Sequence, residues 1–262
     1  MYHGKPCWFE LATDKGALAA ATTFYSTVFG WNFADAGMEG MTYHLASLDG
    51  DMIAGAMEMP ADVVGMPPAW MIYLDVDDID AAAVKIRSLG GMIFREPADV
   101  PGTGRFAIAA DPQGAAFGLL EPAPMDPNPP VEAGAWNQRK DGHGNWIELM
   151  STDPATGFDF YAALFGWTRS RAVDMDGMGT YQLFAWQGTD IGGMMGLGNA
   201  PQPCWLPYFG VNGVKAAMTR ITDAGGTVLH GPVEVPGPAH IAVIRDPQGA
   251  HFAIVGPLHH SE

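Results

Sequence analysis

The stretch Asp-Pro-Gln-Gly-Ala occupies residues 111–115 and occurs again at residues 246–250. Moving outward from it, Phe-Gly-Trp at residues 29–31 returns at residues 165–167. Two further pairs keep the same spacing, residues 8–11 with 146–149 and residues 90–91 with 225–226. All the offsets lie between 135 and 138 residues, and chance matches would not stay in register over so long a stretch. The sequence therefore predicts a duplicated domain.

Each copy is itself predicted to be double. A tryptophan in a strand-like segment is followed six or seven residues later by a short polar residue and then by a helix-like segment, four times along the chain. The four polar residues are Asp14, Asp77, Asp153 and Asn212, and Asp78 is an alternative to Asp77 as the cap of the second helix. Such side chains cap helices. Gly30 is placed to end the first helix, and Asp49-Gly50 is typical of a tight hairpin turn. The predicted order within each of the four modules is β-α-β-β-β.

Composition supports two domains of α+β type. The chain has 262 residues, 48% of them hydrophobic, which is enough for two cores of ordinary domain size. Five prolines crowd the region between the copies, where they would disfavour a helix or a central strand. We therefore predict a first domain at residues 1–121, a Pro-rich linker at 122–139 and a second domain at 140–262.

Charge and cysteine content narrow the functional classes. Thirteen Lys and Arg against 29 Asp and Glu give a net charge of −16, which repels nucleic-acid phosphates. No apolar run is long enough to span a membrane, and no secretion signal is evident. Two cysteines do not make a disulfide framework, so a cytoplasmic location is expected. The expected partner is a small molecule, and the chain is expected to be either a monomer with an internal pseudo-dimer or a homodimer.

These motifs together resemble the vicinal oxygen chelate superfamily, which includes glyoxalase I, extradiol dioxygenases and bleomycin-resistance proteins. The resemblance is carried by Phe-Tyr-x-x-x-Phe-Gly-Trp at residues 24–31, Pro-x-Trp with Val-Asp-Asp at 68–78, and the two Asp-Pro-Gln-Gly turns. It extends to tandem-domain glyoxalase-like proteins of actinobacteria, including an antigen labelled a hydroxylase. The resemblance implies two domains in which paired modules form a curled mixed sheet around a substrate cavity.

The resemblance also implies a divalent metal, but the expected ligand positions lack suitable side chains. By register, those positions are predicted to be Cys7, Met71 and Gly118 in the first half and Asn145, Leu206 and Ala253 in the second half. Met, Gly, Leu and Ala offer no hard donor, and Asn is a poor ligand for a transition metal. We therefore expect no cofactor and no metal at these positions. His143, Asn145 and His251 could still form a different site in the second half.

Seven residues are predicted to contact a ligand. In the second half, His240, His251, Asn145 and Tyr181 are expected to converge on a small oxygenated molecule. In the first half, Arg105 could hold a carboxylate or make a salt bridge at the rim, and Tyr43 could bind a carbonyl or complete the core. Met71 is one of 16 methionines that indicate an adaptable apolar wall.

Two strand carboxylates have an ambiguous role. Glu10 and Glu148 share a strand phase with Trp8 and Trp146, and we expect that face to meet the helices. A carboxylate there is costly unless it is hydrogen-bonded, which favours a structural bond to the backbone or to Trp. The alternative is a general base with a raised pKa.

Three functions remain open. The first is metal-free binding of a small oxygenated or aromatic molecule in the manner of bleomycin-resistance proteins. The second is a lyase, isomerase or dioxygenase that uses a metal or acid–base residues, so whether the chain is an enzyme stays undecided. The third is a non-catalytic dimerisation scaffold. The missing metal ligands favour the first of these.

Overall fold

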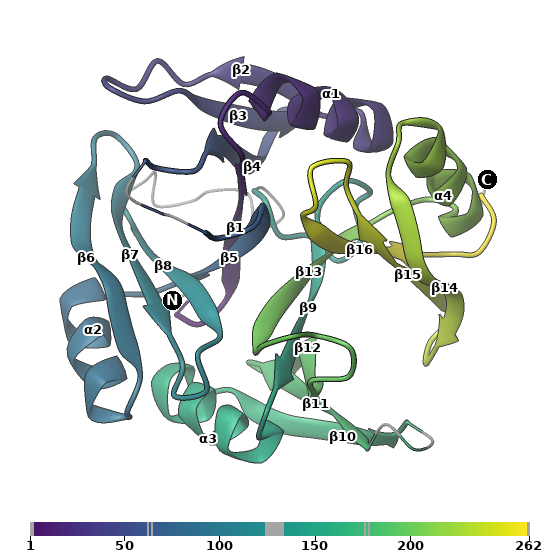
Figure 1. The fold of residues 1–262 in the computed structure, drawn as a ribbon. Helices are drawn as coiled ribbons and strands as arrows, with labels where there is room; N and C mark the ends of the chain where they lie inside the picture. The colour runs from purple at the N-terminus through teal and green to yellow at the C-terminus, as the bar shows by residue number, and fades with distance from the viewer. Residues whose placement is uncertain are drawn as a thin grey trace. The chain divides into compact units, whose positions relative to one another are not determined.

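The structure, a computed structural model, describes residues 3–61, 63, 65–123, 134–175, 177 and 179–260. The chain contains four β-α-β-β-β modules, as the sequence predicts, and the α+β class is confirmed (Figure 1). Most of the predicted Pro-rich linker lies outside the described residues. The domain boundaries at residues 121 and 140 stay a prediction.

The first two modules form one eight-stranded mixed sheet with the order β2-β3-β4-β1-β5-β8-β7-β6. The elements are β1 (Pro6–Thr13), α1 (Leu18–Phe29), β2 (Asn32–Asp35), β3 (Tyr43–Leu48), β4 (Asp51–Glu58), β5 (Ala69–Asp75), α2 (Ile79–Ser88), β6 (Met92–Val100), β7 (Gly104–Ala110) and β8 (Ala116–Pro122).

The last two modules repeat this arrangement, with the order β10-β11-β12-β9-β13-β16-β15-β14. The elements are β9 (Gly144–Ser151), α3 (Pro154–Phe165), β10 (Thr168–Asp174), β11 (Thr180–Trp186), β12 (Thr189–Gly196), β13 (Cys204–Gly210), α4 (Val214–Asp223), β14 (Thr227–Val235), β15 (Ala239–Arg245) and β16 (His251–Gly256).

The predicted helix caps hold for two of the four helices. The side chain of Asp78 accepts a hydrogen bond from the Ala81 amide at the start of α2, and Asp153 does the same for Thr156 in α3. The predictions for the other two helices were wrong, because α1 begins after Ala17 and α4 after Gly213. Neither of those residues has a side chain that can cap a helix. Asp14 instead belongs to a turn in which its carbonyl accepts from the Ala17 amide.

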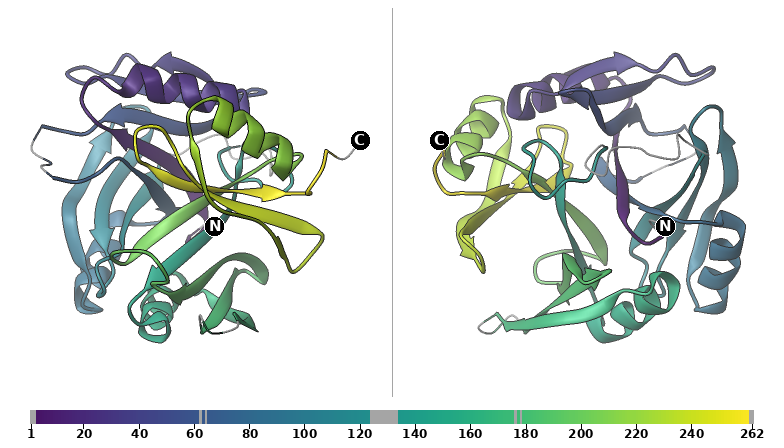
Figure 2. Two further views of the ribbon diagram at one scale, coloured as in Figure 1. Left: turned by 45° about the vertical axis from the view of Figure 1, so that its right-hand side comes forward. Right: turned by 180° about the vertical axis from the view of Figure 1, so that it is seen from behind.

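The compact units of the chain do not follow the sequence halves. Unit 1 combines Met1–Cys7, Ile72–Val131 and Trp146–Leu206, and unit 2 combines Trp8–Met71, Glu132–Asn145 and Pro207–Glu262. Helices α2 and α3 therefore pack together in unit 1, and α1 packs with α4 in unit 2. Both helix pairs can be followed in Figures 1 and 2. Unit 1 thus contains the second half of the first sheet and the first half of the second sheet. Unit 2 contains the first half of the first sheet and the second half of the second sheet.

The motifs that mark the repeat meet in the core of each unit. In unit 2, the Trp70 indole donates to the hydroxyl of Tyr25 over 2.8 Å, and that hydroxyl donates to Asp246 over 2.8 Å. The other oxygen of Asp246 accepts from the amides of Gln248, Gly249 and Ala250. Burial raises the pKa of Tyr25, and the charge of Asp246 adds to the effect. The Asp-Pro-Gln-Gly turn of one sequence half therefore satisfies a buried tyrosine of the other half.

Unit 1 repeats this network. Trp205 donates to Tyr161 over 2.9 Å, and Tyr161 donates to Asp111 over 3.2 Å. A second tryptophan closes each core, since Trp167 donates to the carbonyl of Gly4 and Trp31 to that of Gly142. The repeated Asp-Pro-Gln-Gly and Phe-Gly-Trp motifs are thus explained by buried polar groups that need partners.

Candidate functional site

The sheet face opposite the aromatic cores carries a recurring triad of Trp, Tyr and Glu. On β1, Phe9 and Leu11 are fully buried, and Phe9 packs edge-on against Phe209 of the unit 2 core at 5.3 Å. Because strand side chains alternate, Trp8 and Glu10 lie on the other face. The expectation that Glu10 and Glu148 face the helices was therefore wrong.

In unit 2 the triad is held by two hydrogen bonds. The indole of Trp8 donates to the hydroxyl of Tyr43 over 3.1 Å, and that hydroxyl donates to the carboxylate of Glu10 over 2.8 Å. Burial raises the pKa of Tyr43 above its ordinary value, and the charge of Glu10 adds to this. The phenol therefore stays protonated and donates at neutral pH.

Unit 1 holds the same triad. Trp146 donates to the hydroxyl of Tyr181 over 2.8 Å. Burial raises the pKa of Tyr181, and next in size is the charge of Glu148, to which its side chain is also hydrogen-bonded. Glu148 is 8% exposed. Tyr43 and Tyr181 are thus both hydrogen-bonded to a carboxylate within the protein, whereas Glu10 and Glu148 were expected to bond to the backbone or to Trp. The ligand role of the two tyrosines stays a prediction.

A glycine makes room for each tyrosine. A Cβ on Gly55 would lie 1.8 Å from the hydroxyl of Tyr43, and a Cβ on Gly193 would lie 2.1 Å from the ring of Tyr181. These contacts leave no space for any other residue at the two positions. Each triad of Trp, Tyr and Glu therefore depends on a glycine that leaves room for the tyrosine. All four residues recur at equivalent places in the two sheets.

The superfamily metal positions do not fit a metal in this chain. On β1 and β9 the predicted register was off by one residue, because Cys7 and Asn145 share the phase of the buried Phe9 and Ile147. On the sheet face opposite the aromatic cores, here called the open face, the corresponding residues are Trp8 and Trp146. A Cβ on Gly118 would lie 2.2 Å from the ring of Tyr73, so that aromatic ring fills the place of a ligand side chain there.

Other donors are also engaged. The thiol of Cys7 donates to the carbonyl of Tyr73 over 3.4 Å, and burial raises the pKa of Cys7 well above its ordinary value. A protonated thiol is a poor metal ligand. Within the described residues, no three His, Cys, Asp or Glu side chains are grouped so that they could hold a metal ion.

The predicted second-half cluster does not assemble. His240 pairs across the strands with Gly256, on the face of Ala242 and Ile254, while His251 pairs with Arg245 on the opposite face. The two histidines also lie at opposite ends of the strand pair, about 16 Å apart along it at 3.3 Å per residue. The side chain of Asn145 donates to the carbonyl of Gln138, which fixes the segment before β9. Of the four predicted residues, only Tyr181 belongs to a triad.

His251 lies beside a cation. Burial lowers the pKa of His251, and the charge of Arg245 lowers it further. The side chain is exposed and belongs to the first residue of β16. Its ligand role stays a prediction, without the partners that the sequence assigned to it.

The first-half candidates divide in the same way. Met71 lies on the open face of β5, next to Trp70, which is buried in the core. Arg105 makes the salt bridge expected as its structural alternative, at 2.6 Å from Asp80 and 3.2 Å from Asp99. Its cross-strand partner Glu121 accepts a hydrogen bond from the start of α2, which places Arg105 on the helix side of the sheet.

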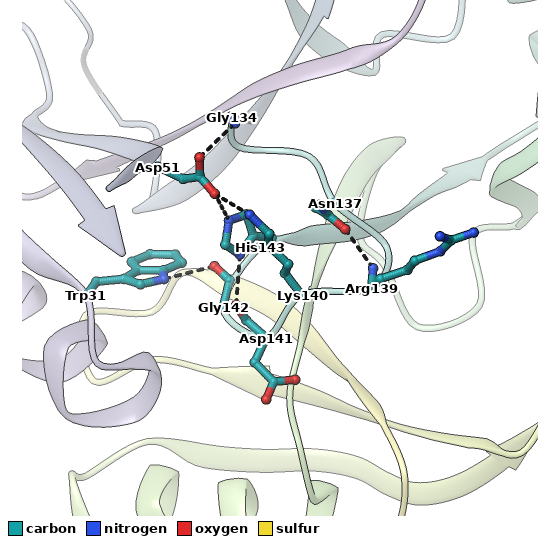
Figure 3. A network of polar contacts seen from close by, with 9 residues as sticks. All are labelled: Trp31, Asp51, Gly134, Asn137, Arg139, Lys140, Asp141, Gly142 and His143. Atoms are coloured by element: carbon teal, nitrogen blue, oxygen red, sulfur yellow. Dashed lines mark hydrogen bonds and ion pairs between the residues drawn. The ribbon is translucent and has the colours of Figure 1, made fainter. Parts of the chain in front are cut away.

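A separate polar network in unit 2 was not predicted as such (Figure 3). Asp51, at the start of β4, accepts from the Lys140 ammonium over 2.8 Å and lies 3.1 Å from His143 Nε2. His143 Nδ1 lies 2.8 Å from the carbonyl oxygen of Asp141. The hydrogen bond from Lys140 lowers the pKa of Asp51, with His143 and the Gly134 amide adding to it. The two ring nitrogens of His143 thus contact the Asp51 carboxylate on one side and the Asp141 carbonyl on the other, which holds the ring in place.

This network locks the segment before β9 onto the β3–β4 hairpin. His143 is 1% exposed, so its ring is buried between the two segments that it joins. The sequence places Asp51 directly after the predicted hairpin turn. Its spacing could not show that Asp51 pairs with His143, which lies 92 positions further along the chain.

Two surface hollows lie away from the triads. One of about 780 Å³ is bordered by α1, α4 and the turn at Pro247-Gln248, and one of about 410 Å³ lies beside Asp14, Glu58 and Met66. Neither contains a triad residue. None of the helices in the described parts of the chain combines the length and apolar character needed to cross a membrane.

Comparison with known proteins identifies the class. Residues 15–119 and 143–254 match the family described as the Glyoxalase/Bleomycin resistance protein/Dioxygenase superfamily. The chain belongs to this superfamily, and the resemblance inferred from its motifs is confirmed.

Similar proteins have varied names. The glyoxylase-type protein CFP32 of Mycobacterium bovis is 32% identical over 97% of this chain and 95% of its own length. The anthracycline biosynthesis protein DauV of a Streptomyces species is 32% identical over 96% of this chain and 93% of its own.

Solved structures share the fold at low identity. The Mn(II)-bound glyoxalase from Novosphingobium aromaticivorans superposes with a TM-score of 0.67 at 14% identity, covering 100% of this chain and 85% of that one. The 2,2',3-trihydroxybiphenyl 1,2-dioxygenase from Sphingomonas wittichii gives 0.68 at 14% identity, covering 97% and 90%. These likenesses establish the fold alone.

Proposed function

We propose that this chain binds a small oxygenated aromatic molecule at its Trp–Tyr–Glu triads, without a divalent metal at the superfamily positions. The observation that carries the proposal is the repetition of the triad in the two sheets. Trp8, Tyr43 and Glu10 in unit 2 match Trp146, Tyr181 and Glu148 in unit 1.

The triads have the chemistry that such a ligand needs. A half-exposed tryptophan supplies a flat apolar surface, while the tyrosine hydroxyl and the carboxylate supply directed polar contacts. One relative is named as an anthracycline biosynthesis protein, and anthracyclines are oxygenated polycyclic aromatic compounds. That name supports an aromatic ligand for this chain.

The metal-free part of the proposal rests on the donor set. Trp8, Met71 and Gly118 stand at the open-face positions of the first sheet, and Trp146, Leu206 and Ala253 at those of the second. None of these side chains is a hard ligand. The ring of Tyr73 over Gly118 further supports the proposal, because it occupies the space in which a ligand side chain would stand.

A second candidate is an acid–base isomerase or lyase. The bond from Tyr43 to Glu10 favours it, because a carboxylate that shares a proton with a phenol can take up and return a proton. Turnover of a bound ligand, lost in Glu10→Gln and Glu148→Gln together, would support this candidate over simple binding. A dimerisation scaffold has no comparable observation in its favour.

The test is a titration of the full chain, dialysed against a chelator, with a panel of oxygenated aromatic compounds, followed by tryptophan fluorescence and calorimetry. We expect binding that survives chelation and is weakened at least tenfold in the double variant Tyr43→Phe with Tyr181→Phe. Arg105→Ala, on the helix side of the sheet, is the matched control. Binding that requires added manganese, iron or zinc would contradict the metal-free proposal, and unchanged binding in the double variant would contradict the site.

A further inference from the structure

The larger surface hollow of unit 2 carries polar groups that the fold leaves available. It has a volume of about 780 Å³ and is bordered by α1, α4 and the turn at Pro247-Gln248. All of its lining residues belong to unit 2, and none of them is part of a triad. We propose that this hollow is a second binding site, which takes a small zwitterion with an apolar body, such as a free apolar α-amino acid. The proposal does not rest on the function proposed for the triads.

Arg220 of α4 provides the donor groups of the hollow. Its Nε donates to the carbonyl of Val28 over 3.3 Å, and this bond ties the guanidinium to the last turn of α1. The charge of Arg220 acts on Asp141, but Arg220 forms no ion pair with a carboxylate of the described residues, and its side chain is exposed. A guanidinium that is held at one nitrogen can bind a carboxylate through the other two.

Asp223 and two threonines provide the acceptor groups of the hollow. Asp223 lies three residues after Arg220 on the same face of α4, is exposed, and makes no ion pair within the described parts of the chain. Thr23 and Thr27 of α1 donate their hydroxyl protons to carbonyls one turn back, over 2.8 and 2.9 Å, so only lone pairs remain on these oxygens. An ammonium group has three protons and no lone pair, and it therefore fits this set of acceptors.

The surface between these polar groups is apolar. Phe24 is 3% exposed, and its ring packs edge-on against Phe252 at 6.3 Å, so it forms a fixed wall of the hollow. Ala20 and Ala224, which also line the hollow, have small side chains that leave its volume open. Small-molecule sites combine such an apolar wall with a few directed polar groups. The ligand should therefore carry an apolar side chain in addition to its two charged groups.

Unit 1 builds the equivalent helix pair, α2 with α3, from different residues at the lining positions. The replacements, at offsets of 135 or 136 residues, are Lys85 for Arg220, Ser88 for Asp223, Leu89 for Ala224 and Asp159 for Thr23. Asp159 is paired with Arg169 over 3.0 Å, and the hydroxyl of Ser88 donates to the carbonyl of Lys85. Packing of the helix pair alone therefore does not account for the two charged side chains in the hollow of unit 2.

The experiment uses three probes that share one phenyl ring: L-phenylalanine, 2-phenylethylamine, which lacks the carboxylate, and 3-phenylpropanoate, which lacks the ammonium. Each is titrated into the full chain at pH 7 and followed by calorimetry and ligand-observed NMR. We expect L-phenylalanine to bind at least about tenfold more tightly than either analogue, because each analogue leaves one charged partner unused. The proposal is wrong if an analogue binds as tightly as L-phenylalanine, or if neither L-phenylalanine nor any other apolar amino acid binds.

Variants test the two charged groups separately. Arg220→Gln should weaken binding of L-phenylalanine at least about tenfold and leave that of 2-phenylethylamine within about twofold. Asp223→Asn should weaken L-phenylalanine as well, but leave 3-phenylpropanoate within about twofold. Lys85→Gln, the matched change in unit 1, should alter none of these affinities.

A further variant tests the space itself. Ala224→Leu introduces the side chain that unit 1 has at Leu89, so it should fill the hollow and weaken L-phenylalanine while the melting temperature stays within about 2 °C. L-phenylalanine binding that persists in Arg220→Gln and in Ala224→Leu, but is lost in Tyr43→Phe with Tyr181→Phe, would place the amino acid at the triads. That result would overturn the site in the hollow and leave binding at the triads intact.

Discussion

Units 1 and 2 each contain a hydrogen-bonded core of the same design, and the two units differ at the edges of these cores. In unit 2 the tyrosine–aspartate bond measures 2.8 Å, and the aspartate accepts from three backbone amides. In unit 1 the corresponding bond measures 3.2 Å, and the amides of Gln113, Gly114 and Ala115 are the backbone donors to the aspartate. The comparison shows that the motifs that reveal the repeat maintain the core and say little about the ligand.

The edges differ in titratable groups. His143 of unit 2 is replaced by Lys5 in the equivalent place of unit 1, where the ammonium lies 5.9 Å from the ring of Trp186. Asp75 of unit 1 has the residue Gly210 as its equivalent in unit 2. The two units should therefore respond to pH in different ways, although their cores are alike.

The largest expected effect is that of Asp246→Ala. The change would leave the hydroxyl of Tyr25 and three turn amides without their acceptor inside a buried core, at a cost of about 3–4 kcal/mol. Chemical denaturation of the full chain, followed by tryptophan fluorescence, measures it.

Asp111→Ala sharpens the comparison. Because its bond to Tyr161 is longer than that of Asp246 to Tyr25, we expect a loss smaller by about 1 kcal/mol than for Asp246→Ala. Equal losses in the two variants would mean that the measured geometry does not set the energy of the network, and negligible losses would mean that the motif is not structural.

The next effect is that of His143→Ala. It removes a buried polar contact of Asp51 and opens a space beneath the β3–β4 hairpin, so we expect a loss of about 2 kcal/mol in the free energy of unfolding. Arg139→Ala, an exposed neighbour in the same segment, should stay within about 0.5 kcal/mol of the wild type.

The pH dependence of that effect has a definite sign. Since the folded-state pKa of Asp51 is lowered, its contribution is present at neutral pH and is lost only as pH falls through that lowered pKa, below about pH 4. A difference between wild type and Asp51→Ala that vanished already at pH 6 would contradict an ionised Asp51.

A smaller effect with the opposite sign is expected for Asp75. Burial raises the pKa of Asp75 to about 6, and the charge of Asp77 adds to this. The folded state therefore prefers the protonated carboxyl, and this stability is fully present below about pH 4 and is lost as pH rises through 6. We expect Asp75→Asn to be more stable than the wild type by about 1–2 kcal/mol at pH 7.5 and equal to it near pH 4.

The control for this prediction is Asp77→Asn, which removes a like charge from Asp75. Without that repulsion the pKa of Asp75 falls, so the loss of stability should be complete at lower pH and be smaller than in the wild type. The pKa should return only part of the way to that of an ordinary carboxyl, because burial, the larger cause, would remain. A stability difference between wild type and Asp75→Asn that is constant from pH 4 to 8 would contradict the assignment.

The sequence predicted the fold well because the repeat appears in local motifs. Phe-Tyr-x-x-x-Phe-Gly-Trp and the Asp-Pro-Gln-Gly turn define where helices and strands end, and these boundaries depend on near neighbours. The pairing of Tyr25 with Asp246 could not be predicted, because it joins residues 221 positions apart and depends on which modules pack together.

The candidate site was harder to predict for a related reason. Side chains alternate between the two faces of a sheet, so an error of one residue reverses the face predicted for each of them. For this reason Cys7 was predicted at the position that Trp8 occupies, and Glu10 was predicted on the helix side of the sheet. Tyr43 and Tyr181 were identified from the repeat, whereas their carboxylate partners depend on how β1 pairs with β4, at Glu10 opposite Gly55.

The smallest expected effect is that of Arg105→Ala. The guanidinium is exposed to solvent on the helix side, and exposed ion pairs contribute little because water and salt screen them. The melting temperature should change by less than about 2 °C, and affinity for any aromatic ligand should stay within about twofold of the wild type. The same ligand should lose at least tenfold in Tyr43→Phe with Tyr181→Phe, so the two variants measured side by side decide which face of the sheet binds. If Arg105→Ala abolished binding while the tyrosine variants kept it, the ligand would lie on the helix side of the sheet and be anchored as an anion, and the triads would not be the binding site.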